Sequence, residues 1–221
     1  MSVEFGPLFS FLMIFIMNVQ IPAGEIDSTV IGMNFGMAFM MAIYMAGGTN
    51  VGASVGISLE AKKLAIIKTL PISYTEFFKV KLEVLDVLAV ISAVLSAAVT
   101  SIYAKGNIVD FIGFSVAAII FIGSSNAFGL LRDLKNPKLN WSNIKEITKN
   151  NMSTLIPMLI LMPAGLIAIA IGVVCHMFIE NSYVCSLALW GSMIAISVLY
   201  YFILRFKVLN KVEPLLEAVE V

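Results

Sequence analysis

The side chains best suited to nucleophilic or metal chemistry are few and lie close together in the sequence. Cys175 and Cys185 stand five residues to either side of Glu180, and the single histidine, His176, follows the first cysteine. Two cysteines and one histidine do not form a zinc signature, so we expect His176 to be packed or interfacial. The two cysteines either form a disulfide, if the outer side is oxidising, or remain free thiols. The sequence therefore predicts no metal and no cofactor held by this chain.

Acidic side chains would indicate an ion path or a catalytic pair if they lay deep inside a membrane span. Glu83 and Asp86 instead follow Lys79 and Lys81 at the mouth of an apolar stretch, and Asp110 lies at the edge of the next one. Interfacial placement is the better interpretation of these acids, which disfavours transport coupled to protons or sodium. One histidine and acids at the ends of spans are poor material for catalysis, so we predict that the chain is not an enzyme.

A basic segment between two apolar stretches carries more information. Leu59, Ile66 and Leu70 form a narrow stripe at 100° per residue, with Lys62 and Lys68 on the other side, which predicts a short amphipathic helix. Pro71 ends that helix, and Ser73 with Glu76 resembles a capping box that starts the next one. A stiff helix of this kind either rests on the membrane surface or serves as a lever for a cytoplasmic partner. The candidate residues for the lever are Ser58, Glu60, Lys63, Ile67, Lys68, Leu70, Pro71 and Ser73.

A second basic segment follows two apolar stretches later. Its candidate functional residues are Asp133, Pro137, Lys138 and Trp141. Trp141 is an amphipathic ring suited to the headgroup level of a membrane, and the basic side chains suit anionic lipid. Asn143 with Glu146 offers a further helix start.

The stretches between these segments must be membrane spans. Of 221 residues, 60% are hydrophobic and 13% are charged. In soluble domains roughly half of the residues are apolar and about a quarter are charged. The net charge is zero and there is no long basic tract, so no nucleic-acid partner is predicted. We predict an all-α membrane protein, one transmembrane domain over residues 1–221 with loops at 56–83 and 132–151. Its six spans are expected at roughly 5–21, 29–55, 84–104, 108–131, 152–179 and 183–205.

Positive charge predicts the orientation of these spans. Lysine and arginine gather in the two long loops and in the tail, whereas the remaining loops hold only Lys105. Because cytoplasmic loops carry the excess of positive charge, we expect both long loops and both termini to face the cytoplasm.

The second predicted span carries a ladder of small residues at four-residue spacing, which lets helix backbones approach closely in lipid. This ladder serves either packing within the chain or a seam with a second copy or half. Its members are Gly32, Gly36, Gly48, Gly52 and Gly56.

The two basic segments resemble those of one known family, the type-2 ABC exporter permeases. The run that begins Ser58-Leu-Glu-Ala and continues Ile66-Ile-Lys-Thr-Leu-Pro-Ile-Ser resembles that family's Ser-Arg-Glu-Gly…Leu-Lys-Ser-Leu-Pro-Ile-Ser element. Asp133-Leu-Lys-Asn-Pro-Lys-Leu-Asn-Trp is similar to its Asp-Leu-Lys-Pro-Lys-Leu-Asn-Trp loop. Leu59 and Ala61 depart from the usual arginine and glycine. The resemblance covers roughly residues 45–160.

The resemblance implies the membrane-spanning subunit of an ATP-binding-cassette exporter in a bacterial plasma membrane, similar to the C-terminal half of longer permeases. A separate ATPase subunit would bind ATP and Mg²⁺ and dock on the loops, with Ser58–Leu70 as the coupling helix. A second permease half or a second copy would complete the pathway. The chain has no Gly-x-x-x-x-Gly-Lys-Ser/Thr phosphate loop of its own. The alternative is a membrane transporter not driven by ATP, or a substrate-capture subunit.

Overall fold

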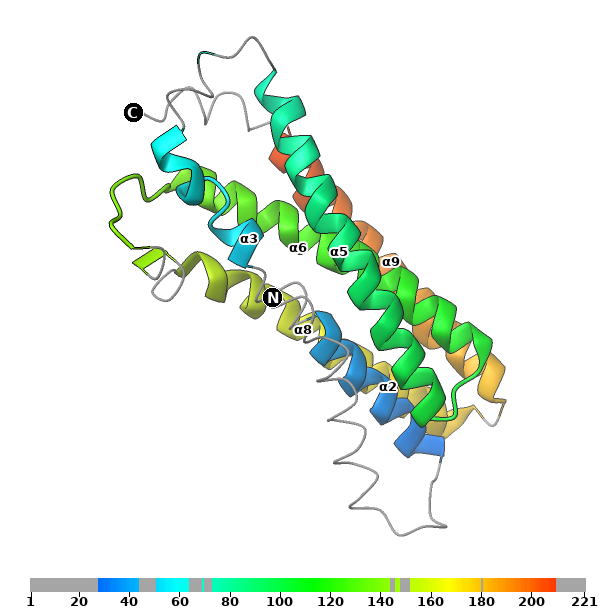
Figure 1. The fold of residues 1–221 in the computed structure, drawn as a ribbon. Coiled ribbons are helices and arrows are strands. Elements are labelled where there is room, and N and C mark those ends of the chain that lie inside the picture. Colours follow the sequence, from blue (N-terminus) through cyan, green and yellow to red (C-terminus); the bar gives the residue numbers. More distant parts are fainter. Residues whose placement is uncertain are drawn as a thin grey trace.

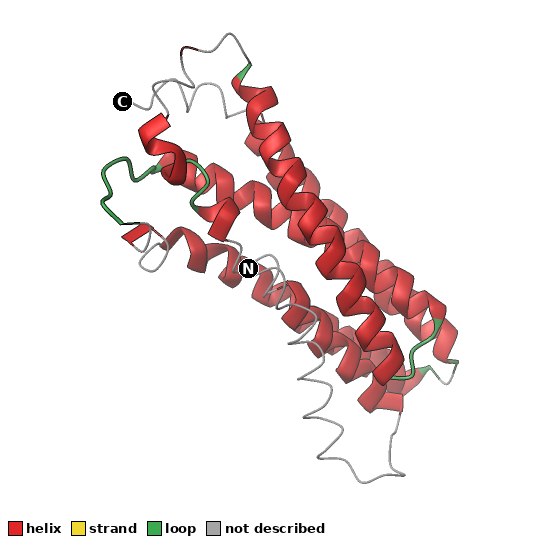
Figure 2. Ribbon diagram, viewed as in Figure 1, coloured by secondary structure: helices red, strands yellow, loops and turns green. Residues whose placement is uncertain are grey.

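Long uncharged apolar runs set the architecture, because backbone N–H and C=O groups in lipid must be satisfied within a helix. The computed structural model describes residues 28–43, 51–63, 69, 73–143, 146–147, 152–179 and 181–209. Within these ranges the secondary structure is helical, with no strand (Figure 2). The elements are α2 (Ser28–Ile43), α3 (Val51–Ser54), the 3₁₀ helix η3 (Ser58–Lys63), α5 (Tyr74–Tyr103), α6 (Ile108–Lys135), α8 (Met152–Phe178) and α9 (Ser182–Leu209).

Three of these helices are long and apolar enough to cross a membrane, namely Glu76–Tyr103, Ile108–Lys135 and Ser182–Leu204. The prediction of an all-α membrane protein is therefore confirmed in this coarser form. The predicted span at 152–179 corresponds to α8, and the one at 29–55 contains α2 and α3, with residues 44–50 between them outside the described part. The predicted span at 5–21 also lies outside it, so six spans stay a prediction.

One helix boundary agrees with the predicted one and another differs from it. α5 begins at Tyr74, directly after Ser73, where the sequence predicts a helix start that runs on into the apolar stretch. Ser73 is its N-cap, as predicted, but its side chain makes no capping hydrogen bond, so the capping-box prediction is wrong in that contact. α6 continues to Lys135, so that Asp133, expected in a loop, is helical.

A reciprocal capping box stands instead at the start of α6. The Asn107 side chain accepts from the Asp110 N–H at 3.1 Å, and Asp110 accepts from the Asn107 N–H at 2.9 Å. Asp110 also accepts from Trp190 Nε1 at 2.9 Å and is buried. It lies at a helix end as predicted, but its environment is the interior of the bundle and not an open interface.

The helices run side by side between two ends of the molecule (Figure 1). α5 and α6 form an antiparallel hairpin, α9 packs along α6, and α2 packs along α8. The core is aromatic around Phe39, whose ring meets those of Phe114, Phe121 and Trp190 at centroid distances of 5.3, 6.0 and 5.5 Å. Edge-to-face rings at these distances add about 0.5–1.5 kcal/mol each beyond the area that they bury.

The glycine ladder is used in more than one way. A Cβ atom on Gly36 would lie 2.5 Å from Ile169 Cα, so α2 and α8 touch backbone to backbone there. Gly56 lies in the turn at 55–57, outside any helix, and so does not continue the ladder. Gly48 is outside the described residues. The contact at Gly36 is packing within one chain, the first of the two interpretations of the ladder.

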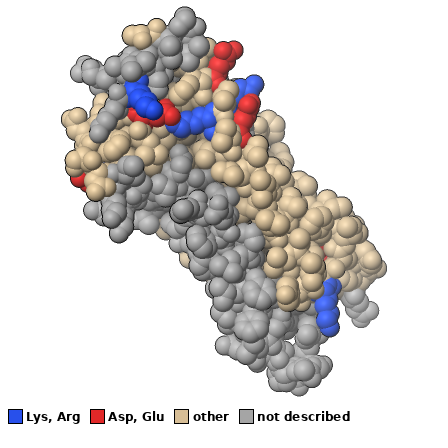
Figure 3. Space-filling model, viewed as in Figure 1, with Lys and Arg blue, Asp and Glu red and all other residues tan. Residues whose placement is uncertain are grey.

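Charge divides the two ends of the bundle. One end carries described basic residues from η3, the start of α5, the end of α6 and the segment after it: Lys63, Lys79, Lys81, Arg132, Lys135 and Lys138. Lys105 lies in the α5–α6 turn at the opposite end. Figure 3 shows this charged end and the uncharged flank beside it. The two predicted loops therefore begin at the same end of the bundle, as the charge pattern requires.

Candidate functional site

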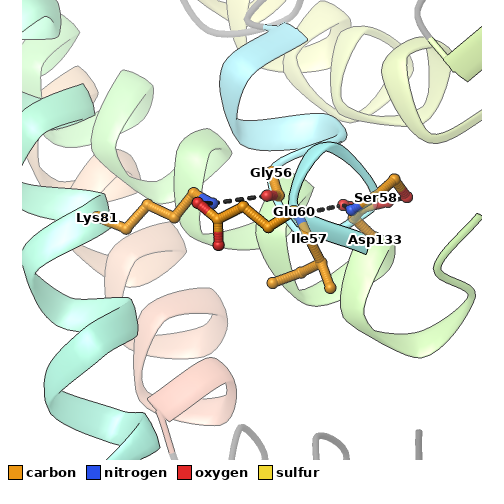
Figure 4. A network of polar contacts seen from close by, with 6 residues as sticks. All are labelled: Gly56, Ile57, Ser58, Glu60, Lys81 and Asp133. Carbon is orange, nitrogen blue, oxygen red and sulfur yellow. Dashed lines mark hydrogen bonds and ion pairs between the residues drawn. The ribbon is translucent and has the colours of Figure 1, made fainter. Parts of the chain in front are cut away.

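The two basic segments meet where Asp133, near the end of α6, reaches the start of η3. Its Oδ2 accepts from the N–H groups of Ile57 and Ser58 at 2.6 and 2.9 Å, and its Oδ1 accepts from Ser58 Oγ at 2.5 Å (Figure 4). Both Asp133 and Ser58 are fully buried. The first N–H groups of a helix have no partner within it, and a carboxylate is a strong acceptor for them. Asp133 thus fixes the start of η3 against α6.

Ser58 also binds the second segment through its remaining polar atoms. Its Oγ accepts from the Lys138 N–H at 3.0 Å, and its carbonyl accepts from Trp141 Nε1 at 2.7 Å. We call Ser58, Asp133, Lys138 and Trp141 the loop junction. Trp141 is half-buried, and its indole N–H forms one of the hydrogen bonds of the loop junction. The two segments, 75–83 residues apart in sequence, form one unit.

A second link joins η3 to α5. Lys81 Nζ donates to Glu60 Oε1 at 2.8 Å and to the Gly56 carbonyl at 2.6 Å. The ammonium also lies 6.0 Å from the centre of the Phe77 ring. The Lys81 and Glu60 side chains are 20% and 30% exposed, so water screens this pair only in part.

An apolar cluster lies beneath these polar links. Ile57, in the turn before η3, is buried among residues of α5 and α6: Phe78, Leu82, Ala127, Leu130 and Leu134. The turn is therefore anchored by packing as well as by hydrogen bonds. η3 is held between two long helices and is not a loosely tethered loop.

Lys63 of the predicted lever, Leu59 of the predicted apolar stripe and Pro137 of the second segment make none of these links. Lys63 is exposed at the end of η3, Leu59 is 38% exposed, and Pro137 is half-buried. The helix over Ser58–Lys63 is 3₁₀ and six residues long, not the longer α-helix expected, in keeping with the use of 3₁₀ helices in short pieces. The predicted lever residues outside the described part of the chain are Ile67, Lys68, Leu70 and Pro71.

The second segment is ordered by a local contact further along. Ser142 donates from its hydroxyl and its N–H to the two carboxylate oxygens of Glu146, at 2.7 and 3.2 Å. These hydrogen bonds lower the pKa of the Glu146 carboxyl from its ordinary value. The Glu146 N–H donates to the Asn143 carbonyl at 2.9 Å, and residues 146–147 are helical, in line with the predicted helix start.

The chemistry-bearing residues at the other end of the bundle stay apart from this junction. Cys175 and Cys185 are free thiols, and Cys185 is buried. In the part of the chain that the structure describes, no three His, Cys, Asp or Glu side chains gather in a way that could hold a metal ion.

Sequence reasoning did not find the parts played by Lys81 and Gly56. Lys81 contributes to the predicted orientation, but nothing local indicates that it meets Glu60, because only the packing of α5 against η3 joins them. The Gly56 carbonyl has no side-chain signal at all. Comparisons of the chain with protein families, with curated proteins and with solved structures find no match. The resemblance to type-2 ABC exporter permeases rests on the residues of the two basic segments.

Removing the Lys81 ammonium is expected to destabilise the protein more than removing the charge of Glu60. Lys81→Met leaves both the Gly56 carbonyl and Glu60 without their donor, a loss of about 2 kcal/mol in the free energy of unfolding. Glu60→Gln should cost about 1 kcal/mol, and the double variant should show a coupling energy of about 1 kcal/mol. Thermal unfolding in detergent measures all three, with exposed Lys79→Met as the matched control. Additive effects of the two substitutions would contradict the link.

Proposed function

We propose that this chain is the membrane-spanning subunit of an ATP-binding-cassette exporter, moved by a separate ATPase subunit that docks at the charged end. The observation that carries the proposal is the loop junction. The two segments that resemble type-2 ABC exporter permeases, far apart in sequence, converge on Ser58 through Asp133, Lys138 and Trp141. If one ATPase subunit docks on both basic segments, we expect the two segments to be bound to each other.

The connections of η3 suit it to transmit force. Asp133 binds it to the end of α6, and Lys81 binds it through Glu60 to the start of α5. Both helices continue from there to the opposite end of the bundle (Figure 1). A displacement of η3 would therefore move two spans as rigid bodies, which is the kind of motion that alternates access in transporters.

The proposal assigns an orientation and partners. The charged end, with the junction, would face the cytoplasm of a bacterium, together with both termini. The partner ATPase would bind ATP and Mg²⁺, and a second permease half or a second copy would complete the pathway. The exposed side chains of η3 that such an ATPase would meet are Leu59 and Lys63.

Co-purification with an ATPase tests the proposal. The tagged chain is extracted gently from its native membrane, its partners are identified, and ATP hydrolysis is measured. Leu59→Ala with Lys63→Ala is expected to weaken the retained ATPase about tenfold. The thermal unfolding of the chain should be unchanged, because both side chains are exposed. Lys105→Ala, at the opposite end, is the matched control and should keep the partner.

Two outcomes would count against this function. A stable, folded chain that retains no ATPase would favour the alternative, a transporter not driven by ATP or a substrate-capture subunit. If the Lys105 variant and the Leu59/Lys63 variant lost the ATPase to the same extent, the ATPase would not dock on η3. Uptake into vesicles that follows an ion gradient without ATP would identify the alternative directly.

A further inference from the structure

A pocket of about 410 Å³ opens beside the loop junction, where η3 faces the first turns of α5. Its lining combines carboxylates, an ammonium and apolar side chains: Glu60, Glu76, Phe77, Val80, Lys81 and Val84. The polar members lie toward the charged end of the bundle. Figure 3 shows charged side chains at this end bordering an uncharged flank. The surface of the pocket is mostly apolar, and the three charged side chains contribute a small part of it.

The apolar side of the pocket continues as a stripe along α5. Val80 and Val84 are 59% and 61% exposed, and they are followed at helical spacing by the exposed side chains of Leu88, Ile91 and Leu95. The rise from Val80 to Leu95 is about 22 Å at 1.5 Å per residue, more than half of a hydrocarbon core of ~30 Å. The stripe is therefore long enough for an acyl chain to follow through one leaflet, and the pocket lies at its end nearest the charged residues.

The charges at that end select among headgroups. Two carboxylates, on Glu60 and Glu76, favour a cation that can donate hydrogen bonds. An ammonium has three donors, of which Lys81 uses two, on Glu60 and on the Gly56 carbonyl. Among the described residues the third meets no further acceptor, and it can donate to a phosphate oxygen. The pocket thus complements a headgroup with a primary amine beside a phosphodiester.

We propose that this pocket binds phosphatidylethanolamine from the bilayer. The lipid ammonium would lie between Glu60 and Glu76, its phosphate would accept from Lys81, and an acyl chain would follow the stripe on α5. Phosphatidylcholine has a cation without N–H donors, and phosphatidylglycerol brings no cation to the carboxylates. This binding does not depend on the function proposed above, because it uses only the membrane and the described side chains.

Lipid titration of the purified chain tests the site. The full chain is delipidated in mild detergent and titrated with phosphatidylethanolamine, phosphatidylcholine and phosphatidylglycerol of identical acyl chains, and native mass spectrometry counts the bound lipids. The ethanolamine lipid is expected to bind about tenfold more tightly than the other two, the worth of one charge-assisted hydrogen bond. Glu76→Gln should lower its affinity to that of the choline lipid.

Two further variants keep the result decisive. Glu83→Gln removes the same charge from an exposed glutamate of α5 outside the pocket lining and should leave lipid binding unchanged. Val84→Trp fills the pocket and should weaken the ethanolamine lipid about tenfold, while an unchanged unfolding temperature shows that the chain is folded. Four outcomes would overturn the proposal. The three lipids could bind with equal affinity, or the glycerol lipid could bind more tightly than the ethanolamine lipid. The two glutamate variants could have equal effects on binding, or a second copy of the chain could fill the pocket.

Discussion

Replacing Asp133 with alanine is expected to lower the free energy of unfolding by about 4 kcal/mol, the sum of two or three buried hydrogen bonds to a charged group. Its carboxylate accepts from the N–H groups of Ile57 and Ser58 and from the Ser58 hydroxyl. Alanine would leave these donors buried without an acceptor. In a chain of this size the unfolding midpoint should fall by about 10 °C, as thermal unfolding in detergent would measure.

Two milder variants separate the carboxylate from its surroundings. Asp133→Asn keeps one acceptor oxygen and should lose about half as much stability as the alanine variant. Ser58→Ala keeps both backbone donors but removes the hydroxyl, which donates to Asp133 and accepts from the Lys138 N–H, and should cost about 2 kcal/mol. Lys135→Ala, exposed on the same turn of α6, is the control and should change little. If the alanine variants at 133 and 135 were equally stable, the junction would not hold the two segments together.

Replacing Gly36 with alanine is expected to lower the free energy of unfolding by about 3 kcal/mol, at the upper end of overpacking effects. The added Cβ would lie 2.5 and 2.8 Å from the Cα and N atoms of Ile169. Because these are backbone atoms, no rotamer change relieves the contact, and α2 must move away from α8. The loss should be the same at every protein concentration, since the contact lies within one chain.

Gly191 provides the matched control for this helix substitution. A Cβ atom there meets nothing within 4 Å, so Gly191→Ala should raise stability by about 1 kcal/mol through helix propensity alone. Unfolding of both variants over a range of protein concentrations measures the difference. A Gly36 variant as stable as the parent, or one whose loss appears only at concentrations where copies associate, would favour the other interpretation of the ladder, a seam between chains.

Much of the fold could be predicted because its determinants are local. The apolar runs that form α5, α6 and α9 are evident from hydropathy, since a span needs about 20 apolar residues in succession. Lysine placement indicates that the two basic segments share a side, and their first residues lie at one end of the bundle. The helix start at Tyr74 follows the predicted signal at Ser73, whereas the predicted end of the fourth span was inaccurate, because α6 continues beyond its apolar core to Lys135.

The candidate site likewise has features that could be predicted from the sequence and features that could not. The motifs alone place Ser58 and Asp133 in the two segments of interest and predict that these segments flank apolar spans. The contacts of Asp133 with η3, of Lys81 with Glu60 and of Lys81 with the Gly56 carbonyl could be found only in the packed bundle. These contacts join residues 21–76 positions apart, and such pairs meet only after the helices have packed. Residue type and local spacing specify the helices, whereas the packing of their faces specifies which polar groups are brought together.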